Sequence, residues 1–325
     1  MLLTSSLIIT LVSACLAGNS FGQLWTDAAD KTLPPDFQIQ GEYEGKKMGA
    51  QVIALGKGRF HAVMYPGGLP GAGWDGQNKS LLDGKLEGDK ALFTAAAGSR
   101  SYMAREADKF SATRNFPPKG HKPYSGSISK GVFSGASSTG AQFSLKRIVR
   151  KSPSLGAKPP RDAVVLFDGT KESMKNWQGG RFDEKTGLLN TDGNDIRTKE
   201  KFLNYIMHVE FMLPFKPDAR SQGRGNSGFY QVDMYEMQIL DSFGLMGLNN
   251  ECGGIYQKAD SKVNMCLPPL QWQVYDVDFN SAVMKDAKKE SNAVLTARLN
   301  GVTIHEKLQI NGKTGGARGE PEGTP

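Results

Sequence analysis

Residues 202–215 constrain the fold more than any other stretch, because apolar and polar side chains alternate along them. The side chains of a strand point alternately to its two faces, so the polar face of this segment carries Asn204, His208 and Glu210. The opposite, apolar face consists of Leu203, Tyr205, Met207, Val209, Phe211 and Leu213. This pattern is typical of a sandwich strand with one buried face.

A second strand-like stretch, residues 235–240, carries the polar side chains that we regard as a candidate site. Tyr235, Met237 and Ile239 form an apolar face, whereas Glu236 and Gln238 point the other way. Alternate residues of a strand lie about 7 Å apart, so both polar side chains can reach one sugar-sized ligand. A solvated outer face would give the same pattern.

The chain of 325 residues is long enough for two domains. Short strand-like runs broken by glycine turns predict a small all-β domain over residues 24–150. Residues 151–161 contain Pro153, Pro159 and Pro160 and are typical of a stiff linker. A second all-β domain is expected over residues 162–325.

Residues 1–22 have the character of a leader that takes no part in the fold. The apolar run 7–12 is too short to span a bilayer, and small residues precede Gln23. We therefore expect export to the periplasm or cell surface. The sequence around Cys15 also resembles a lipoprotein cleavage box, and membrane attachment would follow only if Cys15 is lipidated.

The formal net charge of +7 is concentrated in the first domain, where residues 24–160 contain 20 Lys and Arg against 11 Asp and Glu. The charges are dispersed and lack the basic, aromatic-interleaved pattern of nucleic-acid modules, so we expect no nucleic-acid partner. No spacing typical of a zinc, calcium or nucleotide site occurs. We expect neither a metal nor a cofactor.

Several ordered motifs in the second half resemble the 3-keto-disaccharide hydrolase family. They are Leu166-Phe167-Asp168-Gly169, Trp177, Gly225-Asn226-Ser227-Gly228, residues 235–241, residues 252–256 and Asn300-Gly301-Val302. The resemblance implies a concanavalin-like β-sandwich or jelly roll, exported, acting on a carbohydrate. It also implies a final strand beyond residue 325.

The substrate implied by this resemblance explains why the strand lacks a glycosidase pair of carboxylates: Gln238 has no titratable group, and Asp241 falls on the other face. A ketone at C3 acidifies the C2 proton, so one general base can eliminate the glycosidic oxygen and water can then add. We predict Glu236 as this base, with His208 and Asp241 as the next candidates. The predicted substrate-binding residues are Asn226, Ser227, Tyr230, Gln238 and Trp272.

Three roles within this site stay open. Gln238, Asn226 or Ser227 can act as the neutral donor, and Tyr230 or His208 can supply the proton. A carbohydrate-binding module or a cell-surface scaffold with the same strands would need no base at all.

Cys252 and Cys266 are the only cysteines after the leader. In an exported protein such a pair is expected to form a disulfide.

Overall fold

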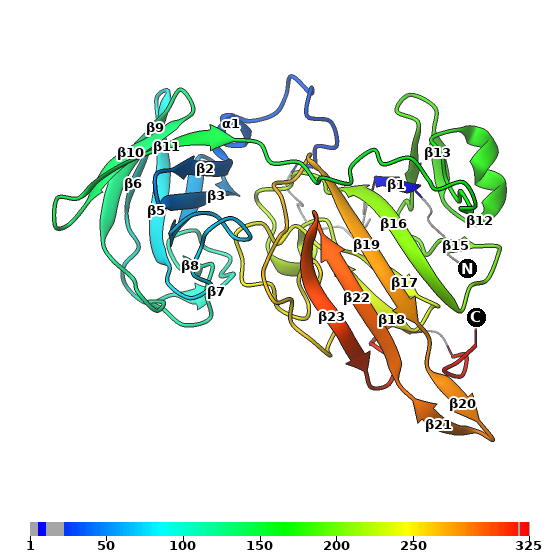
Figure 1. Ribbon diagram of the computed structural model, residues 1–325. Coiled ribbons are helices and arrows are strands. Elements are labelled where there is room, and N and C mark those ends of the chain that lie inside the picture. The colour runs from blue at the N-terminus through cyan, green and yellow to red at the C-terminus, as the bar shows by residue number, and fades with distance from the viewer. Residues whose placement is uncertain (1–5, 11–22, 318, 325) are drawn as a thin grey trace.

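The computed structural model describes residues 6–10, 23–317 and 319–324, and it consists almost entirely of strands (Figure 1). The all-β prediction is confirmed. Helical structure in the described residues is limited to α1 (Pro35–Ile39) and two 3₁₀ turns, Lys171–Asn176 and Ser221–Gly223. None of these helices has the length and apolar character that a membrane crossing requires.

The first half of the chain closes into an eight-stranded antiparallel barrel in the order β10-β11-β2-β3-β4-β5-β6-β9. Its strands are β2 (Gly41–Gly45), β3 (Met48–Gly56), β4 (Arg59–Pro66), β5 (Ser80–Glu87), β6 (Lys90–Ala95), β9 (Tyr124–Ser129), β10 (Val132–Ser137) and β11 (Gln142–Ile148). Side chains fill the interior, where the rings of Phe93 and Phe133 lie 4.9 Å apart. The barrel is therefore a packed core.

The outer face of β3, β4 and β5 forms a second core with the excursion that carries β7 (Ser101–Tyr102) and β8 (Phe110–Ser111). Phe243 and Leu245, from the second half of the chain, are buried in the same cluster. Each half of the molecule thus buries side chains of the other, and the two are joined by apolar packing as well as by the chain.

The second half is built on a seven-stranded sheet in the order β13-β14-β1-β16-β19-β22-β23. Its strands are β1 (Ser6–Thr10), β13 (Arg181–Asp183), β14 (Leu188–Asn190), β16 (Asn204–Met212), β19 (Trp272–Asn280), β22 (Ala293–Leu299) and β23 (Val302–Ile310). Two further strand pairs lie outside this sheet: β12 (Trp177–Gln178) with β15 (Arg197–Thr198), and β20 (Val283–Lys285) with β21 (Lys288–Ser291).

The backbone of β1 lies between β14 and β16 and runs parallel to both. This differs from the expectation that residues 1–22 take no part in the fold, because an extended backbone at this position forms ladder bonds with two neighbours. The rest of the expected leader, including Cys15, lies outside the described residues.

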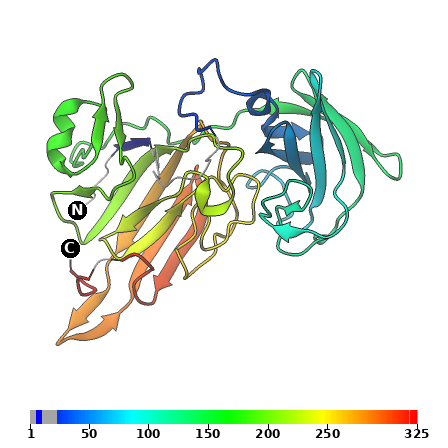
Figure 2. The ribbon, with the colours of Figure 1, turned by 180° about the vertical axis from the view of Figure 1, so that it is seen from behind.

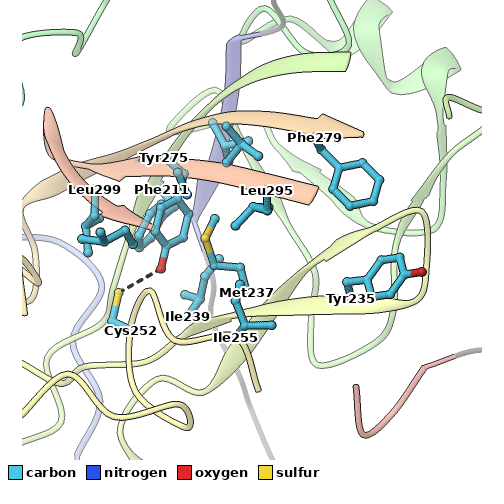
Figure 3. Close-up of a cluster of buried hydrophobic side chains, with 14 of the residues drawn as sticks. Phe211, Tyr235, Met237, Ile239, Cys252, Ile255, Tyr275, Phe279, Leu295 and Leu299 are labelled. Atoms are coloured by element: carbon cyan, nitrogen blue, oxygen red, sulfur yellow. Dashed lines mark hydrogen bonds between the residues drawn. The ribbon is translucent and has the colours of Figure 1, made fainter. Parts of the chain in front are cut away.

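A second layer, β17 (Ser227–Gln231) with β18 (Tyr235–Ile239), covers one face of the large sheet (Figure 2). The core lies between the layers, and the sheet's Phe211, Tyr275 and Leu295 meet Met237 and Ile239 of β18 there (Figure 3). The rings of Phe211 and Tyr275 stack at 4.8 Å. The predicted alternation is therefore confirmed within β16 and β18, whereas Leu203, which was predicted on the apolar face, lies before β16 and is exposed.

Candidate active site

β17 and β18 form an antiparallel pair in which Tyr230 lies directly opposite Glu236. Tyr235, Met237 and Ile239 point inward to the core, so Glu236 points to the outer side of this layer. The free side of β18 is covered by residues 253–256, because the amide of Tyr256 donates to the carbonyl of Glu236 at 3.0 Å. The backbone that carries Glu236 is thus held on both sides.

Glu236 is only 8% exposed, and from the described residues its carboxylate receives one side-chain hydrogen bond, from the Tyr230 hydroxyl to Oε2 at 2.9 Å. Burial disfavours the charged form and raises the pKa of Glu236 above its ordinary value, while the Tyr230 bond acts in the opposite direction. Burial and the neighbouring carboxylate also raise the pKa of Tyr230, which stays a neutral donor. The pair combines a carboxyl group of raised pKa with a fixed hydrogen-bond donor.

Gly228 makes room for this carboxylate. A Cβ atom at Gly228 would come within 2.4 Å of Glu236 Oε1, far closer than two such atoms can approach. The second glycine of the Gly-Asn-Ser-Gly motif is therefore required by the position of Glu236.

Glu236 lies on the wall of a cavity of about 490 Å³, within the usual range for small-molecule sites. The same wall contributes Asn226, Ser227 and Tyr230, so four of the residues predicted from the sequence are brought together. The remaining lining includes Trp177, Asn194, Asp195, Arg197, Lys199, Lys201, Phe202 and Tyr205. Of these, the segment 194–201 was missed by the sequence analysis, since nothing in its local pattern indicates that it lines a cavity together with β17.

Gln238 was predicted to share the ligand with Glu236, and the structure corrects this. Its side chain is 1% exposed, and its Oε1 accepts from the amide of Ile239 at 3.0 Å. Residues 253 and 254 exchange backbone hydrogen bonds with Gln238 and cover it. Gln238 therefore shares a strand face with Glu236 but does not line the cavity.

Asp241 was predicted as an alternative base, and the structure gives it a structural role instead. Arg224 donates to Asp241 Oδ2 from Nε at 2.9 Å and from Nη2 at 2.6 Å, and both side chains are buried. A carboxylate held in this way is an ion-pair partner, not an available base. Trp272 begins β19 opposite Met212 and likewise does not line the cavity.

His208 lies on the face of the large sheet that points away from β18 and therefore away from Glu236. Val209 and Phe211 point into the core between the two layers, so the alternate residues His208 and Glu210 point away from β18. His208 Nδ1 lies 2.6 Å from Asp276 Oδ1, and Nε2 lies 3.1 Å from Glu210 Oε1. The prediction that His208 belongs to the catalytic group is therefore corrected.

The partners of His208 hold the chain that joins the two halves. The Ser154 hydroxyl donates to Asp276 Oδ2 at 2.7 Å, and the amide of Gly156 donates to Glu210 Oε1 at 2.5 Å. Burial alone would lower the pKa of His208, but the bonds to Asp276 and Glu210 outweigh it and raise that pKa to about 9. We call His208, Glu210 and Asp276 the linker clasp.

Cys252 and Cys266 are free thiols, which differs from the expected disulfide. Both are buried, and the Cys252 sulfur contacts the Tyr275 hydroxyl at 3.3 Å (Figure 3). Cys266 is directed to backbone carbonyls, with Leu240 O at 3.6 Å. The two thiols also interact with each other, so they form one buried pair without a disulfide.

Among the described residues, no group of three His, Cys, Asp or Glu side chains is placed to hold a metal ion.

No curated protein matches the chain. One solved structure is similar, a protein from Parabacteroides distasonis whose title reads "putative glycosyl hydrolase". It is 28% identical, with a TM-score of 0.44, over 51% of this chain and 75% of the other. Residues 162–324, which contain every residue of the cavity, match the family described as the 3-keto-alpha-glucoside-1,2-lyase-like domain, and the chain belongs to that family.

Proposed function

We propose that the cavity binds a 3-keto-glucoside and that Glu236 removes the proton from C2 of the keto sugar. The observation that carries this proposal is the position of Glu236: a buried carboxyl group of raised pKa on a cavity wall, with a donor fixed beside it. Such a group is suited to abstract a carbon-bound proton next to a ketone.

The electrons of the C2–H bond first form the enolate of the C3 ketone. The ketone then re-forms, a double bond forms between C1 and C2, and the C1–O bond to the leaving sugar breaks. The leaving oxygen takes a proton from a donor in the cavity. Water then adds at C1 and a proton returns to C2, so that the overall change is hydrolysis of the glycoside.

The donor for the leaving oxygen is expected on another wall of the cavity. In an α-glucoside the C2–H and C1–O bonds lie on opposite faces of the ring, so a base and a donor on one wall cannot serve both. The segment 197–201 contributes Lys199 and Lys201 to the lining, and an ammonium group is a possible proton donor. Asn226 and Ser227 are suited to bind the sugar hydroxyls or the enolate oxygen.

We also propose export, as the leader-like composition of residues 1–22 suggests. A carbohydrate present outside the cytoplasm would then be the substrate. Fractionation of cells that produce the full chain tests this, and a product confined to the cytoplasm would contradict it.

The proposed activity is tested with 3-keto-trehalose, with ordinary trehalose as the matched control. Release of glucose from the first and not the second is expected, and in D₂O the released keto sugar should carry deuterium at C2 beyond the enzyme-free background. A folded protein that binds the keto sugar without cleaving it would instead be a carbohydrate-binding module. Cleavage of trehalose itself would point to a conventional glycosidase.

A further inference from the structure

The segment after β23 reaches back to the candidate site. The amide of Thr314 donates to the carbonyl of Met234 at 2.9 Å, and the Thr314 hydroxyl accepts from the amide of Glu236 at 2.8 Å. Thr314 is buried. Residues 314–316 are thereby fixed against the start of β18.

This attachment places a second acceptor next to Tyr230. The hydroxyl oxygen lies 2.9 Å from Glu236 Oε2 and 3.1 Å from the carbonyl oxygen of Gly315. A tyrosine hydroxyl has a single proton, so it can donate to only one of these two acceptors at a time.

We propose that the Tyr230 hydroxyl donates its hydrogen bond to the Gly315 carbonyl whenever Glu236 is protonated, and to Glu236 whenever Glu236 is a carboxylate. The hydroxyl thus changes its acceptor each time Glu236 takes up or releases a proton. When Glu236 is a carboxylate, Tyr230 donates to it. When Glu236 has taken a proton, its O–H donates to the Tyr230 oxygen, and the Tyr230 O–H turns to Gly315. No bond to carbon changes in this step, and Tyr230 keeps one proton throughout.

Both protonation states of Glu236 are therefore hydrogen-bonded in a buried site, where an unpaired form would be costly. Under the proposed function, Glu236 must pass through both states in every turnover. The catalytic use of the switch rests on that proposed function, whereas the switch itself is a property of the protein without substrate.

Gly316 keeps the hydroxyl in place between its two acceptors. A Cβ atom at Gly316 would come within 2.5 Å of the Tyr230 oxygen, so a side chain there must displace it. Gly312 offers a matched control four residues earlier: its φ of +76° equals the +75° of Gly316, and a Cβ there meets only Lys258 Nζ at 3.7 Å. Alanine strains the backbone equally at both positions.

Other charged groups also face the pair and contribute to its titration. Asp195 and Tyr256 act on Tyr230, and further charges line the cavity: Arg197, Lys199, Glu200, Lys201 and Asp233. None of these is changed in the experiment, so their contribution is constant across the variants.

The test is the carboxyl ¹³C titration of Glu236 by NMR, assigned by the loss of its resonance in Glu236→Gln. Tyr230→Phe should raise the pKa of Glu236 by less than the roughly one to two pH units that a hydrogen bond to a charged group alone is worth, because it also removes the bond that protonated Glu236 donates to Tyr230. A shift of the full size would mean that protonated Glu236 has no bond to Tyr230 and would contradict the proposal. Gly316→Ala should move it in the same direction, and Gly312→Ala should leave it unchanged.

The double variant Tyr230→Phe with Gly316→Ala decides how Gly316 acts. If Gly316 acts through the hydroxyl, adding Gly316→Ala to Tyr230→Phe gives no further shift. An equal shift in both backgrounds, or no shift from Gly316→Ala alone, would overturn the proposal. Because this titration uses no substrate, a failure to cleave 3-keto-glucosides would leave its outcome intact.

Discussion

His208 and Asp276 face each other across β16 and β19, with Nδ1 and Oδ1 2.6 Å apart, on the face of the large sheet that points away from β18. Because the folded-state pKa of His208 is raised from 6.5 to about 9, its ion pairs stabilise the protein fully below pH 6.5. This stabilisation is lost as the pH rises through 9.

We therefore expect His208→Gln to lower the free energy of unfolding by at most about 3 kcal/mol at pH 6, and by much less at pH 10. Urea titrations of both proteins at the two pH values measure the difference. A loss that is the same at both pH values would show that the imidazolium charge contributes nothing. Activity at pH 7 should be unchanged in this variant.

Glu236→Gln keeps the shape of the side chain and removes the base, so cleavage of 3-keto-trehalose should fall by about 10² to 10⁴. The matched control is Glu306→Gln, the same change at an exposed carboxylate paired with Lys262. Initial rates of glucose release and thermal melting are to be measured on both. Parental activity in a folded Glu236→Gln protein would remove Glu236 from the mechanism.

The raised pKa of Glu236 determines the pH at which kcat/KM should decline on the acidic side of the pH profile. A base acts only when deprotonated, so kcat/KM should decline as the pH falls through a value above 4.5, the ordinary pKa of a glutamate. The pH profile of the parent protein measures this value. A limb at or below pH 4.5 would mean that another group acts as the base.

Asp241→Asn should destabilise the protein without changing the chemistry. It leaves the buried Arg224 guanidinium without its charge partner, which costs about 3 to 5 kcal/mol in comparable cases. We expect a much lower melting temperature and, at a temperature where the variant is folded, a nearly normal pH profile. A shifted profile at normal stability would return Asp241 to the list of bases.

Cys252 and Cys266 should resist thiol reagents in the folded protein and react once it is unfolded, because both are buried. Peptide mass spectrometry after alkylation with and without denaturant identifies each cysteine separately. Rapid labelling of either one in the native protein would contradict the packing around Tyr275.

The strands at residues 204–212 and 235–239 were predictable because side-chain alternation is a local property of the sequence. Which sheet a strand joins is not local: His208 and Glu236 have the same pattern of neighbours, yet His208 points away from Glu236. Gln238 shares a face with Glu236 but is covered by residues 253 and 254, a contact that no periodicity contains. The wall formed by residues 194–201 depends on the same kind of long-range packing.

Arg224 links the two halves of the molecule, because its Nη1 also donates to the carbonyl of Ala54 in the barrel at 3.1 Å. Arg220 makes a similar bond to Leu55 O at 2.9 Å, and the linker clasp holds the connecting chain against the large sheet. The barrel is therefore held in a fixed position relative to the second half of the molecule and is not a domain that moves freely on a flexible linker. Any ligand bound by the barrel would be held at one distance from the cavity and in one orientation relative to it. Lengthening the linker alone would therefore not change the distance between such a ligand and the cavity.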